Sequence, residues 1–148
     1  ISVTDYWFNG GPGYFHYGSH NTNHTFEAQI GYDFGPLALN WYTNFAGTDG
    51  VNNEGDRAYS SYISATVPFT LAGLEWTAEI GATPWATDFY NYSEDPVCNG
   101  SNGFAVCDIS LGAAKEIRIT DSFSVPAFAK VTVNPRTEGA YFVFGLSF

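Results

Sequence analysis

Basic side chains are scarce in this chain. Its 148 residues include 5 Lys and Arg against 15 Asp and Glu, which gives a net charge of −10 and a pI near 4.3. Nucleic-acid binding needs a basic surface, and docking onto anionic lipid headgroups needs juxtaposed Lys and Arg. The composition therefore argues against both, so nucleic acid is not an expected partner, and it permits the attraction of cations.

Long hydrophobic runs are absent as well. Hydrophobic residues make up 45% of the chain and aromatic residues 18%, yet the mean hydropathy is only −0.11, so apolar and polar residues are interleaved. A membrane-spanning helix needs about 20 mainly apolar residues in succession. The sequence excludes a helical membrane protein, and its length predicts one domain over residues 1–148.

Cysteine occurs only at Cys98 and Cys107, on either side of an Asn-Gly-Ser-Asn-Gly run that can close a small loop. An even count with a turn between predicts one disulfide and an oxidising compartment, although two free thiols fit the sequence too. Two cysteines alone make a poor zinc site. The chain shows no signal peptide and no initiator Met, as expected for a mature or trimmed product.

Strict alternation of apolar and polar residues is what the sequence does contain, most visibly at its end. Residues 140–148 place every second side chain on one face of a strand and finish on an aromatic residue. Chain ends normally fray and are polar, so we expect this end to be buried in a core or a bilayer. The apolar face carries Ala140, Phe142, Phe144, Leu146 and Phe148.

Seven further segments alternate in the same way and are bounded by Gly, Pro, Asn or Asp. With the last segment they predict eight strands, at residues 1–8, 24–34, 37–45, 59–69, 74–85, 105–117, 124–134 and 140–148. Short turns follow the second, fourth and sixth strands, and longer loops follow the first, third and fifth; the connection after the seventh is the exception. Outer-membrane barrels alternate periplasmic turns with extracellular loops in this way. We therefore expect an all-β fold, an antiparallel up-and-down transmembrane β-barrel with eight strands visible in this chain.

Alternation alone does not decide which face is outside, because a soluble lipocalin-like barrel uses the same pattern with its apolar residues inward. Two features favour the membrane. The polar face is rich in Gly, Ala, Ser and Thr with few charges, unlike a solvated surface, and aromatic residues gather near the strand ends, as in membrane girdles. The predicted girdle residues are Trp7, Phe34, Phe45, Phe69, Trp76, Trp85 and Phe148.

The other face then points into the lumen and carries the charged residues of the strands. They are Glu27, Asp33, Glu75, Glu79, Asp108, Glu116 and Lys130. An eight-stranded barrel is just wide enough to be filled by side chains, which favours a packed interior with Tyr42, Tyr62 and Tyr141. If strands precede Ile1, a wider barrel with an acidic, cation-preferring pore is favoured instead.

Several stretches spread along the chain carry a family resemblance. They are Val3-Thr4-Asp5-Tyr6-Trp7, Phe45-Ala46-Gly47 with Asp56-Arg57-Ala58-Tyr59-Ser60, Ala114-Lys115-Glu116-Ile117 with Phe123-Ser124-Val125-Pro126 and Asn134-Pro135, and Val143-Phe144-Gly145-Leu146-Ser147-Phe148. With them the chain resembles the C-terminal portion of Bacteroidetes outer-membrane proteins of the TorF-type porin family. The resemblance implies a bacterial outer-membrane β-barrel without assigned chemistry, in contact with outer-membrane lipid and lipopolysaccharide. Longer members imply further strands before Ile1.

Two loops contain groups that bind metals in other proteins. His16, His20 and His24 are spaced by four, which on a helix aligns a metal face, but the Gly, Ser and Asn residues between them favour a solvated loop. The loop from Asp49 to Asp56 is rich in oxygen ligands, yet its spacing does not fit the twelve-residue calcium loop, and turn formation explains it as well.

The leading hypothesis for function is a passive pore, or a structural or accessory barrel in an envelope protein complex, with no chemistry or cofactor of its own. One alternative is a soluble β-barrel or sandwich that binds a sugar or apolar ligand through Trp41, Trp76 and Trp85. The least favoured is a lipid-modifying outer-membrane enzyme, in which Ser60 or Ser61 would approach His24.

Overall fold

The computed structural model describes residues 1–8, 13–18, 22–90 and 103–147. The described part is all-β, and none of it forms a helix that could cross a membrane. All eight predicted strands are present: β1 (Ser2–Trp7), β2 (His24–Asp33), β3 (Ala38–Gly47), β4 (Ser61–Leu71), β5 (Leu74–Thr83), β6 (Ala105–Thr120), β7 (Phe123–Asn134) and β8 (Gly139–Leu146). Each strand pairs antiparallel with the next along the chain, in one sheet.

The connections alternate as the sequence predicts. Tight turns join β2 to β3, β4 to β5 and β6 to β7, at one end of the sheet, while the long connections and the turn after β7 lie at the other. The turn between β4 and β5 consists of Ala72 and Gly73, whose φ angles of 55° and 72° belong to the left-handed turns that match the twist of a hairpin. We call these two ends the turn end and the loop end.

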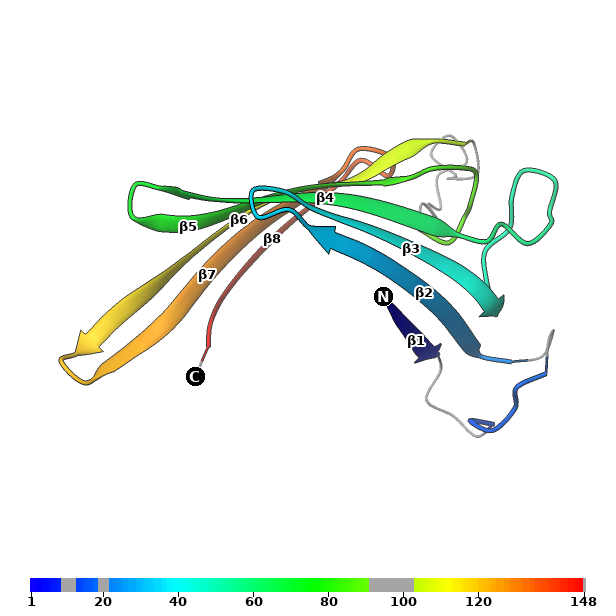
Figure 1. Cartoon of the computed structure of the whole chain (residues 1–148), viewed down its shortest axis with the longest axis horizontal. Helices are drawn as coiled ribbons and strands as arrows, with labels where there is room; N and C mark the ends of the chain where they lie inside the picture. Colours follow the sequence, from blue (N-terminus) through cyan, green and yellow to red (C-terminus); the bar gives the residue numbers. More distant parts are fainter. Residues whose placement is uncertain (9–12, 19–21, 91–102, 148) are drawn as a thin grey trace.

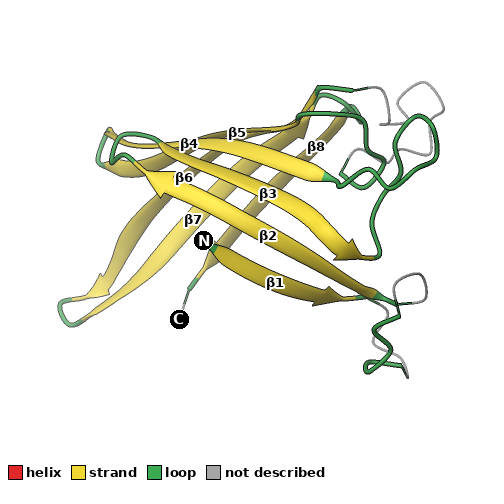
Figure 2. Ribbon diagram, turned by 45° about the vertical axis from the view of Figure 1, so that its right-hand side comes forward, coloured by secondary structure: helices red, strands yellow, loops and turns green. Residues whose placement is uncertain are grey.

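The expected closure into a barrel is wrong for this chain. The sheet order runs from β1 to β8 without pairing between these two strands, and among the described residues β1 contacts only β2 and β8 only β7. Figures 1 and 2 show a curved sheet, an open trough with β1 and β8 as its free edges. A closed barrel requires every strand to have two neighbours, and the curvature of these eight strands covers only part of a cylinder.

The strand register separates the side chains into two faces. One row places Ile30 opposite Trp41 and Trp41 opposite Ile63, while another places Glu79 between Thr66 and Ser110. We call these the apolar face and the polar face. The apolar face is open to its surroundings: 57% of Ile30, 64% of Phe142 and 77% of Phe144 are exposed.

Burial is the reverse of that in a soluble domain. Only four hydrophobic residues of the described part are buried, Ala58, Ala82, Cys107 and Val125. The side chains that are almost completely buried are polar or charged, and they lie around the loop end of the sheet. They are His24, Thr25, Asn44, Ser60, Ser61, Thr83 and Thr87.

Gly47 ends β3 beside a bulge between β2 and β3 at Phe26 and Glu27. Its φ of +78° is in the left-handed region, and a Cβ there would lie 2.0 Å from the His24 carbonyl oxygen. No side chain fits, so only glycine allows this close approach of the two backbones.

We expect Gly47→Ala to destabilise the sheet more than Gly35→Ala does. Gly35 also has a positive φ, +93°, but there is open space where its Cβ would stand. Alanine at this position therefore loses only the free energy of holding an L-residue in the left-handed conformation, about 1–2 kcal/mol. Urea unfolding followed by tryptophan fluorescence measures both. Equal losses in the two variants would contradict the clash at Gly47.

Candidate functional site on the polar face

The seven charged residues predicted to share one face do share it. Cross-strand pairing puts Glu27 opposite Thr4, Glu79 opposite Thr66 and Asp108 opposite Gly81, all on the polar face. They are spread along the face rather than gathered in one cluster. Glu27 is buried, Glu79 and Asp108 are half-buried, and the others are exposed, namely Asp33, Glu75, Glu116 and Lys130.

Among the carboxylates of the described residues, Glu27 is the most deeply buried, with 8% of it exposed. Tyr6 of β1 donates its hydroxyl to Glu27 Oε1 at 3.1 Å, and Tyr90, beyond the end of β5, donates to Oε2 at 3.1 Å. Burial, and then the negative charge of Glu27, raise the pKa of Tyr90, so the phenol keeps its proton and remains a donor. This contact joins segments that are 63 positions apart in the sequence.

A cluster of tyrosines surrounds this contact. The ring of Tyr62 lies 6.0 Å from that of Tyr42 and 5.6 Å from that of Tyr90. Gly81 on β5 makes room for it, since a Cβ at Gly81 would lie 1.9 Å from the Tyr62 hydroxyl oxygen. Gln29 completes the row by donating to the Tyr42 hydroxyl at 3.2 Å.

The remaining carboxylates of the polar face are bonded mainly to hydroxyl groups rather than to opposite charges. Thr66 donates to Glu79 at 3.0 Å, and Ser110 donates to Asp108 at 2.6 Å. Ser124 donates to Glu116 at 3.2 Å. Within the described residues Lys130 forms no ion pair, so its charge is not used to neutralise any of these acids.

Two long connections are locked together at the loop end. Trp85 donates its indole N–H to the Ala58 carbonyl at 2.8 Å, and the hydroxyls of Ser60 and Thr87 share a bond of 2.6 Å. The Val51 amide donates to Asp88 Oδ1 at 2.8 Å. The segment that follows β5 is therefore fixed on the connection between β3 and β4.

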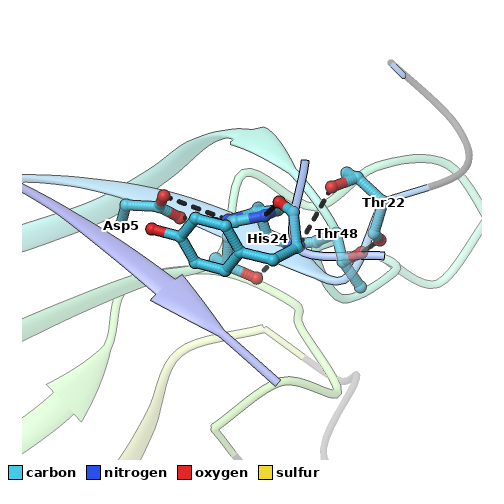
Figure 3. A network of polar contacts seen from close by, with 6 residues as sticks. Asp5, Thr22, His24 and Thr48 are labelled. Atoms are coloured by element: carbon cyan, nitrogen blue, oxygen red, sulfur yellow. Dashed lines mark hydrogen bonds and ion pairs between the residues drawn. The ribbon is translucent and has the colours of Figure 1, made fainter. Parts of the chain in front are cut away.

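His24 joins the connection between β1 and β2 to the loop end of the sheet (Figure 3). Its Nδ1 lies 2.8 Å from Asp5 Oδ1, and its Nε2 lies 2.5 Å from the Tyr14 carbonyl oxygen. Both oxygens accept only, so the ring satisfies both as an imidazolium. Thr48 donates its hydroxyl to the Thr22 carbonyl, also drawn in Figure 3.

These contacts form neither the metal site nor the catalytic pair that the sequence analysis considered. Both ring nitrogens of His24 are engaged, His16 is exposed, and His20 lies outside the described residues. No group of three metal-ligating side chains occurs in the part of the chain that the structure describes. Ser60 is bonded to Thr87, and Ser61 to Thr43 at 2.8 Å, so the structure does not bring either serine together with His24 as a nucleophile and base.

The acidic loop from Asp49 to Asp56 folds as a turn held by its own side chains. Asn52 Oδ1 accepts from the amides of Glu54 and Asp56 at 2.9 and 3.0 Å. The Asp49 carboxylate accepts from the Ser60 amide at 3.1 Å. These bonds give the side chains of Asn52 and Asp49 a role in forming the turn.

The predicted girdle residues lie near the two ends of the sheet. At the turn end Phe69 stacks on Trp76 with ring centroids 6.2 Å apart, and Phe34 is exposed. Trp7, Phe45 and Trp85 lie at the loop end, and Phe148 lies outside the described residues.

The tryptophans proposed for a ligand site are not together. Trp85 lies 5.7 Å from Trp41 by ring centroids, whereas Trp76 stacks at the other end of the sheet. Trp41 borders an apolar groove of about 620 Å³ on the apolar face. The groove has Ala65 and Ala82 in its lining, with Ile30, Ile80 and Phe104.

Cys107 is buried, with its Sγ 3.9 Å from the Gly81 carbonyl oxygen. Its predicted partner, Cys98, lies outside the described residues. The disulfide therefore stays a prediction.

Thr87→Val tests the lock between the two loops. The substitution keeps the shape of the side chain but removes the hydroxyl that bonds to Ser60 and accepts from the Phe89 amide at 3.0 Å. Leaving buried partners unsatisfied costs about 1–3 kcal/mol, which urea unfolding measures. Thr70→Val, at an exposed position, is the control, and the same loss in both variants would argue against a loop-specific effect.

The chain matches no protein-family model, no curated protein and no solved structure.

Proposed function

We propose that this chain forms part of the wall of a bacterial outer-membrane β-barrel that acts as a passive pore for small hydrophilic solutes. The observation that carries the proposal is the uncovered apolar face, which continues from Val3 in β1 to Leu146 in β8. Soluble monomers rarely expose a contiguous apolar patch larger than a few hundred Å². Lipid and lipopolysaccharide acyl chains are the surroundings that match it.

The two ends of the sheet support the same placement. Trp76 at the turn end donates its indole N–H to the Leu71 carbonyl at 3.1 Å, and Trp85 at the loop end donates to Ala58. Aromatic side chains with one apolar and one hydrogen-bonded edge suit the boundary between hydrocarbon and headgroups. The groove beside Trp41 opens on the same face, where an acyl chain can fill it.

The free edges of β1 and β8 favour a pore over a packed barrel. In a bilayer an open edge leaves backbone groups without partners, so the wall needs further strands outside residues 1–148 to close. The resemblance to the TorF-type porin family, whose longer members imply further strands before Ile1, agrees with this need. More than eight strands gives a wider lumen, and an excess of carboxylates over Lys130 on its lining favours cations.

A soluble sandwich, the alternative expected from alternation, requires a second layer over the apolar face. No such layer is present in the described residues, whose strands all belong to one sheet. The apolar residues that would form its core are instead exposed.

Phe142→Lys and Tyr141→Lys form a matched test of the membrane placement. They are neighbours on β8, on opposite faces, and 64% and 63% exposed. A Lys on the lipid face costs about 2–4 kcal/mol near the bilayer midplane, so Phe142→Lys should impair folding into phospholipid vesicles while Tyr141→Lys folds almost normally. Urea titration of vesicle-bound protein measures the difference.

Pore activity is tested separately with the intact protein in planar bilayers. We expect discrete conductance steps. Absence of steps in a correctly inserted protein would reject the pore and leave a structural or accessory barrel. A protein that stays monodisperse without detergent would reject the membrane placement itself.

A further inference from the structure

The segment after β5, residues 84–90, runs from Trp85, beside Trp41 of the apolar face, to Tyr90 on the polar face. The hydroxyl of Tyr90 reaches Glu27 of β2, and its ring lies 5.6 Å from that of Tyr62 of β4. Adjacent strands are about 4.8 Å apart, so a contact from beyond β5 to β2 extends over about 14 Å of the sheet. Tyr90 therefore lies over the polar face of the sheet.

This segment is hydrogen-bonded along residues 85–88 as well as at Tyr90. Trp85, Thr87 and Asp88 are each hydrogen-bonded to the connection between β3 and β4. Gly50 of that connection lies so close that a Cβ there would be 2.5 Å from Asp88 Oδ1. Moving the segment outward would break the buried hydrogen bond between Ser60 and Thr87, and a buried polar group left without a partner costs about 1–3 kcal/mol.

The bond between Tyr90 and Glu27 is charge-assisted, since an ionised acceptor strengthens the hydrogen bond. Glu27 also accepts from Tyr6 of β1, so both of its oxygens have a donor. The two hydrogen bonds hold the Glu27 carboxylate in place, and the carboxylate holds the Tyr90 ring over the polar face.

We propose that the end of this segment, residues 87–90, forms a fixed constriction on the polar side of the sheet and that Tyr90, held by Glu27, sets the size limit for solutes. The proposal rests on the pore function proposed above and deepens it. Tyr90 is the specificity-determining residue, and Glu27 is a positioning residue that acts through it. Small hydrophilic solutes and hydrated ions pass, and larger sugars are excluded.

Two substitutions separate the ring from its hydrogen bond. Tyr90→Ala removes the ring from the passage, so we expect a higher single-channel conductance and loss of the exclusion of larger sugars in a liposome-swelling assay. Tyr90→Phe keeps the ring but loses the bond to Glu27, so we expect a fluctuating conductance around a level near that of the unsubstituted protein. Tyr141→Ala, an exposed tyrosine of the polar face on β8, is the control and should change neither property.

The position of the segment is measured independently of conductance. A benzoylphenylalanine placed at position 90 of the folded protein should be captured by the peptide that contains Glu27 or the one that contains Tyr62, and capture elsewhere would overturn the placement. Unsubstituted protein without conductance would overturn the pore and the constriction together. Conductance that is normal in the unsubstituted protein and unchanged in Tyr90→Ala would overturn the constriction alone.

Discussion

The hydrogen-bonded register between neighbouring strands is the constraint on which the rest of this molecule depends. Side chains alternate with a period of two, so a slip of one residue would move every apolar side chain of a strand to the polar face. The pairing of Ile30 with Trp41 and of Glu79 with Thr66 keeps both faces continuous over the sheet. Turn geometry supports the same register, because Ala72 and Gly73 adopt the left-handed conformations that suit a two-residue hairpin turn. The two-faced surface follows from this register and not from a hydrophobic core.

Because apolar burial is sparse, buried polar groups hold the loop end together. Ser60 and Thr87 bond to each other, and Asp5 bonds to His24, in each case across segments distant in sequence. Buried polar groups are costly unless they are paired, so this network is stable only when all three long connections are in place. On the polar face Glu27, Glu79, Asp108 and Glu116 accept hydrogen bonds from tyrosine, serine or threonine hydroxyls. Hydroxyl partners satisfy an acid without cancelling its charge, which leaves the face acidic.

The strands, their faces and the alternation of connections could be predicted from the sequence, because each depends on local periodicity. Closure could not be predicted, since it depends on accumulated curvature and on the number of strands, which no single segment encodes. The contact between Glu27 and Tyr90 was missed because the path of a long connection leaves no periodic signal. The pair of Asp5 and His24 did leave one: each interrupts an otherwise apolar face near the same end of adjacent strands. An acidic and a basic side chain in such positions predict an ion pair once the two strands are aligned as neighbours.

The position of Tyr90 also bears on the width of the proposed barrel. In a closed eight-stranded barrel the side chains of the strands fill the interior, and here those side chains include the rings of Tyr6, Tyr42 and Tyr62. Yet the polar face holds one more ring, from a connection, between Tyr62 and Glu27. A segment fits there because the trough is more open than a closed barrel of the same eight strands would be. The free edges of β1 and β8 and the position of Tyr90 over the polar face both follow from this open curvature, and each supports the proposal of a wall with more strands than these eight.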